Sequence, residues 1–104
     1  MIISIHGREL IPDKILGQVK YGGINIHPCL WKYKGADPIK RLIADKSPIA
    51  SVGAHRMTDK VDEGEVLVEH FIHLQPYQSE ADVYNQLYPL YPIVLIEALR
   101  KVEA

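Results

Sequence analysis

Apolar residues run almost without interruption through residues 1–6, a pattern typical of a strand that is buried on both faces of a parallel sheet. A second short apolar strand is predicted at residues 24–27, directly after a pair of glycines. Between these strands, a proline opens a short predicted helix at residues 12–16. The chain therefore begins with a strand, a helix and a second strand.

Two further strands are predicted at residues 51–57 and 65–74. Residues 58–64 between them are polar and end in glycine, so we expect a connecting loop. Alternation along the last strand places His70 and His73 on opposite faces. We therefore do not expect these two histidines to bind a metal ion together.

A helix is predicted where Asp37 offers an N-cap and Pro38 occupies the first helical position. Apolar residues follow on one side of this helix, which should end near Asp45. Ser79 is the expected N-cap of a last helix in the C-terminal region. Two prolines interrupt that helix, and a kink and two stacked helices both fit the pattern.

This succession of elements predicts one α/β domain over residues 1–104, with a mostly parallel sheet and flanking helices. The chain has 104 residues, 47% of them hydrophobic, which is enough for a single core. Ligands of such sheets gather at the carboxyl ends of the strands. Candidate chemistry is therefore sought where the predicted strands end.

Charge and cysteine content narrow the partners and the compartment. The 12 Lys and Arg residues nearly balance the 13 Asp and Glu residues without forming a basic stripe, so the electrostatic signature of nucleic-acid binding is absent. A single cysteine cannot form an intramolecular disulfide, and no export signal is present, so we expect a cytoplasmic location. The longest apolar run is too short to cross a membrane.

Two polar side chains, an amide and an imidazole, lie at the end of the second predicted strand. Asn25 and His27 are two positions apart, so both point to one face. In acyl transfer, an amide can donate to the oxygen that becomes negative, and an imidazole can donate to the same oxygen or carry a proton. A carboxylate such as Asp62 can orient and stabilise that imidazole. No nucleophilic side chain is needed if the substrate brings its own amine.

Three segments resemble the folate-dependent formyltransferases, a family that includes glycinamide ribonucleotide, methionyl-tRNA and sugar-amine formyltransferases. The segments are Gly-Ile-Asn-Ile-His-Pro-Cys-Leu at residues 23–30, Tyr-Lys-Gly at 33–35, and residues 51–64. The combination of Asn-x-His-Pro with a distant His-x6-Asp-x-Gly is specific to the family. The resemblance implies a partial Rossmann-like fold that matches the C-terminal half of the family's catalytic domain.

The resemblance also implies the reaction. The formyl donor would be 10-formyltetrahydrofolate, and the acceptor would be a primary amine. Asn25, His27 and Asp62 match the family's catalytic residues, which stabilise the tetrahedral intermediate and relay a proton from the attacking amine. Nucleic acid is implied as a partner only if a tRNA carries that amine.

Folate-binding positions of the family are matched as well. Arg8 and Leu10 match positions that line the pterin pocket in some members. Thr58 and Val61 lie in the segment that matches the loop closing over the pterin. His55 matches a position beside the site. We expect no metal ion in this site.

The chain departs from the family in two places. Cys29-Leu30-Trp31-Lys32 stands where the family usually has Ser-Leu-Leu-Pro, which affects the loop shape and the acceptor contacts. The family's N-terminal half, which carries much of the acceptor site, has no counterpart before residues 1–6. A sheet that begins there would expose an apolar edge and face. We expect a second copy of the chain to cover it; a complementary half-domain, a rearranged fold and an inactive gene fragment are the alternatives.

Each candidate residue also has a purely structural explanation. Asn25 and His27 can satisfy backbone groups of a loop, and Asp62 can be an ordinary turn aspartate before glycine. His55 can be a satisfied strand histidine, and Arg8 can be a surface charge.

Two other features invite a functional interpretation. Cys29 is expected to be a small buried thiol rather than a nucleophile. Three tyrosines at helical spacing are expected to form a packing stripe or an oligomer contact: Tyr84, Tyr88 and Tyr91.

Three functions remain open at this point. The first is a formyltransferase that acts on a primary amine, either alone or only as an oligomer or with a partner. The second is a noncatalytic remnant or accessory module that keeps the fold. The third, a hydrolase of formylated folate, would release formate without any acceptor.

Overall fold

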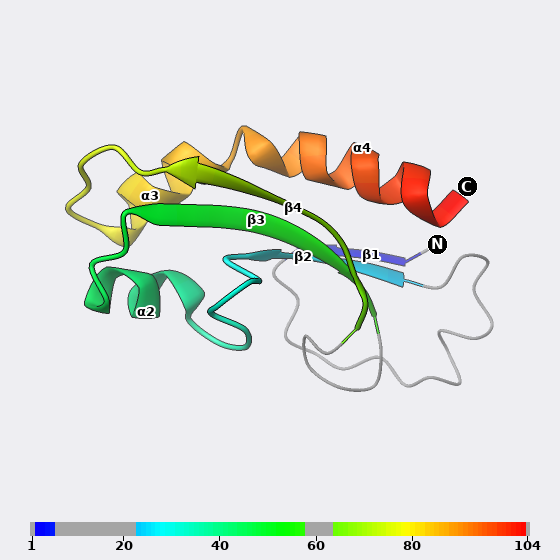
Figure 1. Cartoon of the computed structure of the whole chain (residues 1–104), viewed down its shortest axis with the longest axis horizontal. Helices are drawn as coiled ribbons and strands as arrows, with labels where there is room; N and C mark the ends of the chain where they lie inside the picture. The colour runs from blue at the N-terminus through cyan, green and yellow to red at the C-terminus, as the bar shows by residue number, and fades with distance from the viewer. Residues whose placement is uncertain (1, 6–22, 58–63, 104) are drawn as a thin grey trace.

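The computed structural model describes residues 2–5, 23–57 and 64–103. Four strands form one sheet in the order β1-β2-β3-β4 (Figure 1). Their bounds are Ile2–Ile5 for β1, Gly23–Pro28 for β2, Ile49–Arg56 for β3 and Val66–His73 for β4. All four predicted strands are present with small shifts of their ends, whereas the helix predicted at residues 12–16 lies outside the described residues.

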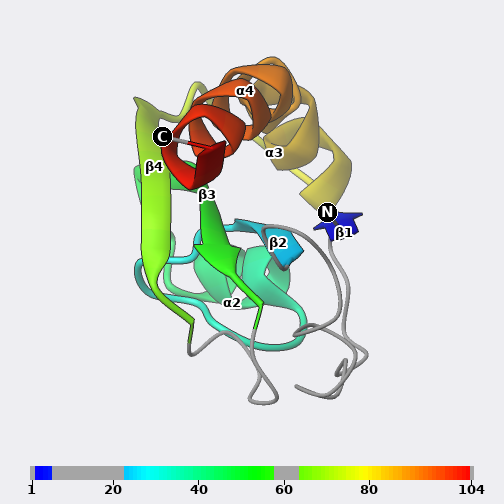
Figure 2. The same cartoon turned by 90° about the vertical axis from the view of Figure 1, so that its right-hand side faces the viewer.

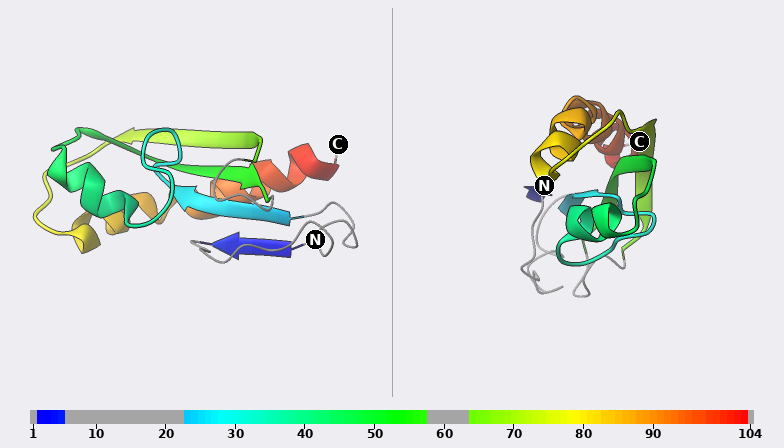
Figure 3. Two further views of the ribbon diagram at one scale, coloured as in Figure 1. Left: turned by 90° about the horizontal axis from the view of Figure 1, so that it is seen from below. Right: turned by 90° about the vertical axis from the view of Figure 1, so that its left-hand side faces the viewer.

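The directions of the strands correct the expectation of a mostly parallel sheet. β1 and β2 are parallel, but β2 and β3, and β3 and β4, pair antiparallel (Figure 3). Parallel neighbours need a crossover of about a dozen or more residues, which the short segment between β3 and β4 cannot provide. The sheet is therefore mixed, and the predicted α/β class is confirmed.

Helices lie on both sides of the sheet (Figure 2). The C-terminal helices α3 (Glu80–Leu87) and α4 (Leu90–Glu103) pack on one face. Helix α2 (Pro38–Ala44) lies on the other side, past the C-terminal end of β2, where it also contacts α3 (Figure 1). We call the face under α3 and α4 the α4 face and the opposite face the α2 face. His70, the cross-strand partner of Val52, contacts Glu97 of α4, which assigns the side of Val52 to the α4 face.

The α4 face of the two central strands holds the apolar core. Its side chains on these strands are fully buried: Ile24, Ile26, Ala50, Val52 and Ala54. They belong to one cluster with apolar residues of the C-terminal helices: Val83, Leu87, Val94, Ala98 and Val102. Removing this apolar surface from water is the main favourable contribution to folding.

Of the two predicted helix N-caps, Ser79 caps its helix through its side chain and Asp37 does not. Pro38 opens α2, but the N-cap residue Asp37 is left-handed (φ 52, ψ 50), and its side chain makes no capping hydrogen bond. A capping side chain requires an extended backbone, as at Ser79, whose Oγ accepts from Asp82 N at 3.2 Å. The predicted last helix is two helices in the structure, because α3 ends at Leu87 and α4 begins at Leu90.

β1 is the apolar edge strand that the sequence predicted, but the expectation that it is buried on both faces is wrong for the described residues. Ile3 and Ile5 pair with Ile24 and Ile26 of β2. The two β1 side chains are 45% and 54% exposed, whereas both β2 side chains are fully buried. The apolar core thus ends abruptly at β1 in the described part of the chain.

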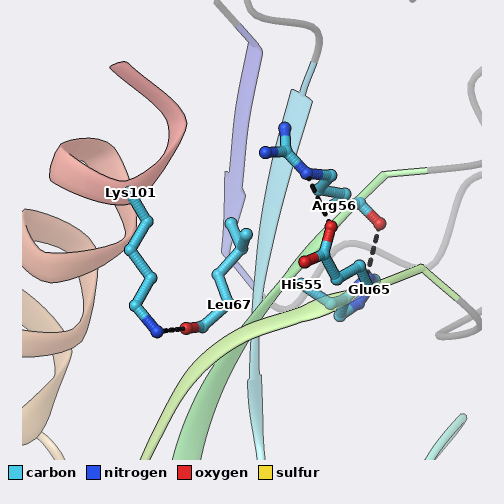
Figure 4. Close-up of polar contacts among 5 residues, drawn as sticks. All are labelled: His55, Arg56, Glu65, Leu67 and Lys101. Atoms are coloured by element: carbon cyan, nitrogen blue, oxygen red, sulfur yellow. Dashed lines mark hydrogen bonds and ion pairs between the residues drawn. The ribbon is translucent and has the colours of Figure 1, made fainter. Parts of the chain in front are cut away.

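Polar contacts fasten α4 to the opposite edge strand, β4. Lys101 Nζ donates to Leu67 O at 2.5 Å (Figure 4), where a register shift opposite Ala54 and His55 leaves Leu67 as an extra residue. His70 Nε2 lies 2.7 Å from Glu97 Oε2. His73 pairs with Ile49 and His70 with Val52, so the two histidines of β4 lie on opposite faces, as predicted from their spacing.

Candidate functional site

Asn25 and His27 lie on the α2 face of the sheet, two positions apart on β2. Their side chains are 6% and 5% exposed. Their partners on β3 are His55 and Gly53, respectively. The expected convergence of the amide and the imidazole on one face is therefore present. Because burying polar groups costs free energy unless they are hydrogen-bonded, their placement needs support from the surrounding backbone.

Two backbone carbonyls orient the His27 ring. Nδ1 lies 2.6 Å from Pro28 O, and Nε2 lies 3.0 Å from Gly35 O. A neutral imidazole donates from one nitrogen only, whereas a protonated ring donates from both. The protonated ring satisfies both carbonyls at once. In a neutral ring, one nitrogen is an acceptor and faces a carbonyl oxygen, which is also an acceptor. A proton donor of the substrate can replace this unfavourable contact.

The site loop, residues 29–35, turns back from β2 and ends beside the imidazole. Cys29 is left-handed (φ 55), and its carbonyl accepts from Tyr33 N at 2.9 Å. Gly35 is also left-handed (φ 86), a conformation that glycine adopts without strain. The loop thus begins two residues after His27 and returns its last carbonyl to the same ring.

Side chains of α2 and its C-cap hold one side of the site loop. Tyr33 OH donates to Asp45 Oδ2 at 2.7 Å, and Arg41 donates to Lys34 O at 2.5 Å. The Arg41 guanidinium also lies 5.8 Å from the centre of the Tyr33 ring, within the range of a cation–π contact. These contacts couple the position of α2 to the shape of the loop.

A carboxylate on β4, Glu69, holds the other side of the site loop. Its Oε2 accepts from Trp31 N at 2.8 Å and from Ser51 Oγ at 2.6 Å. The Trp31 ring then packs edge-on against Tyr33 and Phe71, with 5.6 Å between centroids in both pairs. Sequence reasoning did not identify Glu69, because its partners are distant in the chain.

Gly53 provides the space for this arrangement. It lies between His27 and Glu69 in a row of cross-strand partners. A Cβ at Gly53 would stand 2.9 Å from Leu30 Cβ and 3.3 Å from Glu69 Cδ. A glycine within a strand often marks such a close approach, so this position was a signal that the sequence did contain.

The Cys29 thiol is fully buried, as predicted. Burial raises the pKa of Cys29 from 9.0 to about 11; a backbone hydrogen bond with Ser51 opposes the rise, and the charge of Glu69 adds to it. The thiolate is the nucleophilic form of cysteine. Cys29 is therefore a structural thiol at neutral pH.

The described residues on either side of residues 58–63 are held by β2 and β3. Met57 N donates to Gly23 O at 2.9 Å, and Arg56 N donates to Glu65 O at 2.9 Å. A Cβ at Gly64 would stand 1.7 Å from Arg56 O, so only glycine fits where the chain returns.

Several predicted site residues lie outside the described part of the chain. The candidate catalytic residue Asp62 and the candidate folate-binding residues belong to this group: Arg8, Leu10, Thr58 and Val61. Their expected roles therefore stay predictions.

His55 lies beside Asn25 as its cross-strand partner, and its side chain is buried. His55 Nδ1 lies 2.9 Å from Arg56 O (Figure 4), which fits the explanation of a satisfied strand histidine. Within residues 2–5, 23–57 and 64–103, no cluster of His, Cys, Asp or Glu could hold a metal ion. No described helix has the length and apolar character needed to cross a membrane.

The fold and the Asn-x-His-Pro strand define a formyltransferase-type α/β domain, and comparison with known proteins agrees. The model of the family described as "Formyl transferase" matches residues 1–99. The chain therefore belongs to the formyl transferase family.

Relatives of known name are similar over the whole chain but are much longer. Methionyl-tRNA formyltransferase of Thermotoga neapolitana is 30% identical over 104 residues, which are 99% of this chain and 33% of the relative. GDP-perosamine N-formyltransferase of Brucella melitensis is 28% identical over 99% of this chain and 40% of the relative. The chain thus spans about a third of the length of its methionyl-tRNA formyltransferase relatives.

Solved structures share the fold. Phosphoribosylglycinamide formyltransferase from Bacillus halodurans superposes with a TM-score of 0.80 at 17% identity, over 96% of this chain and 52% of that chain. HypX from Aquifex aeolicus, solved with tetrahydrofolic acid, superposes with a TM-score of 0.84 at 20% identity, over 98% of this chain and 18% of that chain. The Rossmann-like character expected from the sequence is thereby confirmed.

Proposed function

We propose that this chain is the part of a folate-dependent formyltransferase that carries the reacting centre. It would transfer the formyl group of 10-formyltetrahydrofolate to a primary amine. The observation that carries this proposal is the buried pair Asn25 and His27 on one face of β2, in a chain of the formyl transferase family. Solved relatives with tetrahydrofolic acid or with formyl-tetrahydrofolate bound support a reduced folate as the donor.

The chemistry of these side chains fits such a donor. When the amine nitrogen attacks the formyl carbon, negative charge develops on the formyl oxygen. The Asn25 amide and a His27 N–H are donors without negative charge, buried where their interaction with that oxygen is strong. The bond between the formyl carbon and the folate nitrogen then breaks, and the amine proton passes to the leaving nitrogen.

His27 would serve as the proton carrier in this transfer. Its ring nitrogens are held by Pro28 O and Gly35 O, so the imidazole is oriented before substrate binds. Asp62 would stabilise the protonated ring. The hydrogen bond of Met57, just before the segment carrying Asp62, to Gly23 of the Asn25 strand supports this role. Gly64, just after the segment, lies against Arg56 on the neighbouring strand β3.

The test measures tetrahydrofolate and formate production from 10-formyltetrahydrofolate with and without amine acceptors. Asn25→Ala and His27→Ala are each expected to reduce transfer by roughly 10²–10³-fold, the usual effect of removing one such donor. Asn85→Ala and His73→Ala replace exposed residues of the same types and serve as matched controls. Full activity in the site variants would disprove the catalytic assignment.

Two other outcomes separate the alternative functions. Formate release without an amine would identify a hydrolase of formylated folate. Absence of turnover from both the isolated chain and its oligomer would identify a noncatalytic module. We expect weak transfer or none from an isolated single copy, because the chain spans only part of its relatives.

The exposed edge at β1 is expected to bind a second copy of the chain. Ile3 and Ile5 would be covered by pairing of the two β1 edges around a two-fold axis. Light scattering should give the mass of a dimer, and Ile5→Lys should give a monomer. Ile93→Lys changes an exposed apolar residue of α4 and is the matched control. A monomer in the unmodified chain would disprove the homodimer and favour a complementary half-domain.

A further inference from the structure

Glu69 occupies a position in the sheet that connects it to the candidate site. It lies on β4 opposite Gly53, which in turn lies opposite His27. Cross-strand partners share a face, so Glu69 and His27 point to the same side, two strand spacings or about 10 Å apart. Gly53 has no side chain, and Leu30 of the site loop fills the space above it.

The carboxylate of Glu69 joins the loop to the sheet. Oε2 accepts both from Trp31 N in the site loop and from Ser51 Oγ, which is fully buried on β3. Hydrogen bonds to a charged acceptor are about twice as strong as neutral ones. The start of the loop is also tied to β3, because Cys29 N donates to Ser51 O at 2.8 Å.

The same loop ends at the imidazole. Trp31 and Gly35 are separated by only three residues, and Tyr33 between them is bonded to Asp45. Gly35 O lies 3.0 Å from His27 Nε2. A shift of the loop at Trp31 therefore moves the carbonyl that fixes one side of the ring.

We propose that Glu69 is a positioning residue for His27. By holding Trp31 N and Ser51 Oγ, it keeps the site loop in the shape in which Gly35 O meets the imidazole. The orientation of the ring can be measured without turnover. Only the expected consequence for formyl transfer rests on the proposed function.

The experiment records the ring ¹⁵N and ¹H signals of His27 by NMR in the full chain. Glu69→Ala should shift these signals and the backbone amide signal of Trp31, while Glu69→Gln, which keeps an acceptor oxygen of the same size, should restore both in large part. Ser51→Ala removes one donor and should produce a smaller shift of the same kind. Glu65→Ala removes an exposed ion pair between Glu65, just before β4, and Arg56 at the end of β3. It is the control and should leave His27 unchanged.

A His27 spectrum that stays the same while the Trp31 amide moves would overturn the proposal. If Glu69→Ala does not fold, the same comparison is made with Glu69→Gln and Ser51→Ala, and unchanged ring signals in both would overturn it equally. If transfer activity is present, Glu69→Ala should lower kcat by up to about 10²-fold and change the KM of the folate little. If the wild-type chain is inactive both as a single copy and as an oligomer, the proposed function fails, but shifted His27 ring signals in Glu69→Ala still support the positioning role.

Discussion

The two faces of the same central strands differ sharply in what they bury. On the α4 face, Ile24, Ile26 and Val52 are fully buried in an apolar core. On the α2 face, Asn25, His27, Ser51 and His55 are nearly as inaccessible, yet all are polar. Apolar burial stabilises the fold directly, whereas each buried polar side chain must recover its lost hydration through specific hydrogen bonds.

This difference teaches that the α2 face keeps its buried polar groups at a cost in stability, which fits the proposed role of the face in formyl transfer. Its polar groups are held by non-local contacts, such as Glu69 with Trp31 and Gly35 with His27. The α4 face needs only apolar side chains of the right volume. Substitutions on the α4 face should therefore change stability alone, and substitutions on the α2 face should also change the geometry of His27.

The largest expected effect on stability comes from the α4 face. Ile26→Ala removes a fully buried side chain and should lower the free energy of unfolding by about 2–5 kcal/mol, measured by urea titration. The NMR signals of the His27 ring in the folded fraction should stay at their wild-type positions. A loss below about 1 kcal/mol would show that the α4 face is not the main core.

On the α2 face, a smaller loss of stability is expected, together with a shift of the His27 NMR signals. Gly53→Ala places a methyl group 2.9 Å from Leu30, so the site loop must move, at about 1–3 kcal/mol. Unlike Ile26→Ala, it should shift the His27 ring signals. Ala54→Gly changes the next residue on the other face and is the control. If Ala54→Gly shifted His27 as much as Gly53→Ala does, the two faces would not be independent.

The sequence predicted the α4 face better than the α2 face for a physical reason. Apolar periodicity and caps such as Ser79 are local, and they located the strands and the C-terminal helical region. Strand direction was predicted wrongly because it depends on how the connections turn, as at the left-handed Cys29.

On the α2 face, the sequence predicted Asn25 and His27 from a motif but not the role of Glu69. That role depends on residues 31, 51 and 69 meeting in space. No local period records such a meeting, and only the glycine at position 53 indicated it.

The buried thiol of Cys29 allows the site loop to be probed by pH. The pKa of Cys29 is raised to about 11 in the folded chain, so folding keeps the thiol neutral. Its contribution to stability is complete below its ordinary pKa of 9.0 and is lost as the pH rises toward 11. Over that range, the wild type should lose stability relative to Cys29→Ala. Because the charge of Glu69 adds to the rise, Glu69→Gln should begin its loss at the same pH and complete it at a lower one.

The smallest effect on stability is expected where α4 meets β4 at the edge of the sheet. The side chains of His70 and Glu97 are 37% and 42% exposed, and half-exposed ion pairs contribute about 0–1 kcal/mol. Glu97→Gln should therefore change the urea midpoint little, at low or high salt, in contrast to Ile26→Ala. Equal effects of the two substitutions would mean that edge contacts, rather than the apolar interface, attach α4. The proposed division of roles between the α4 face and the α2 face would then fail, because α4 could be released without disturbing the core beneath it.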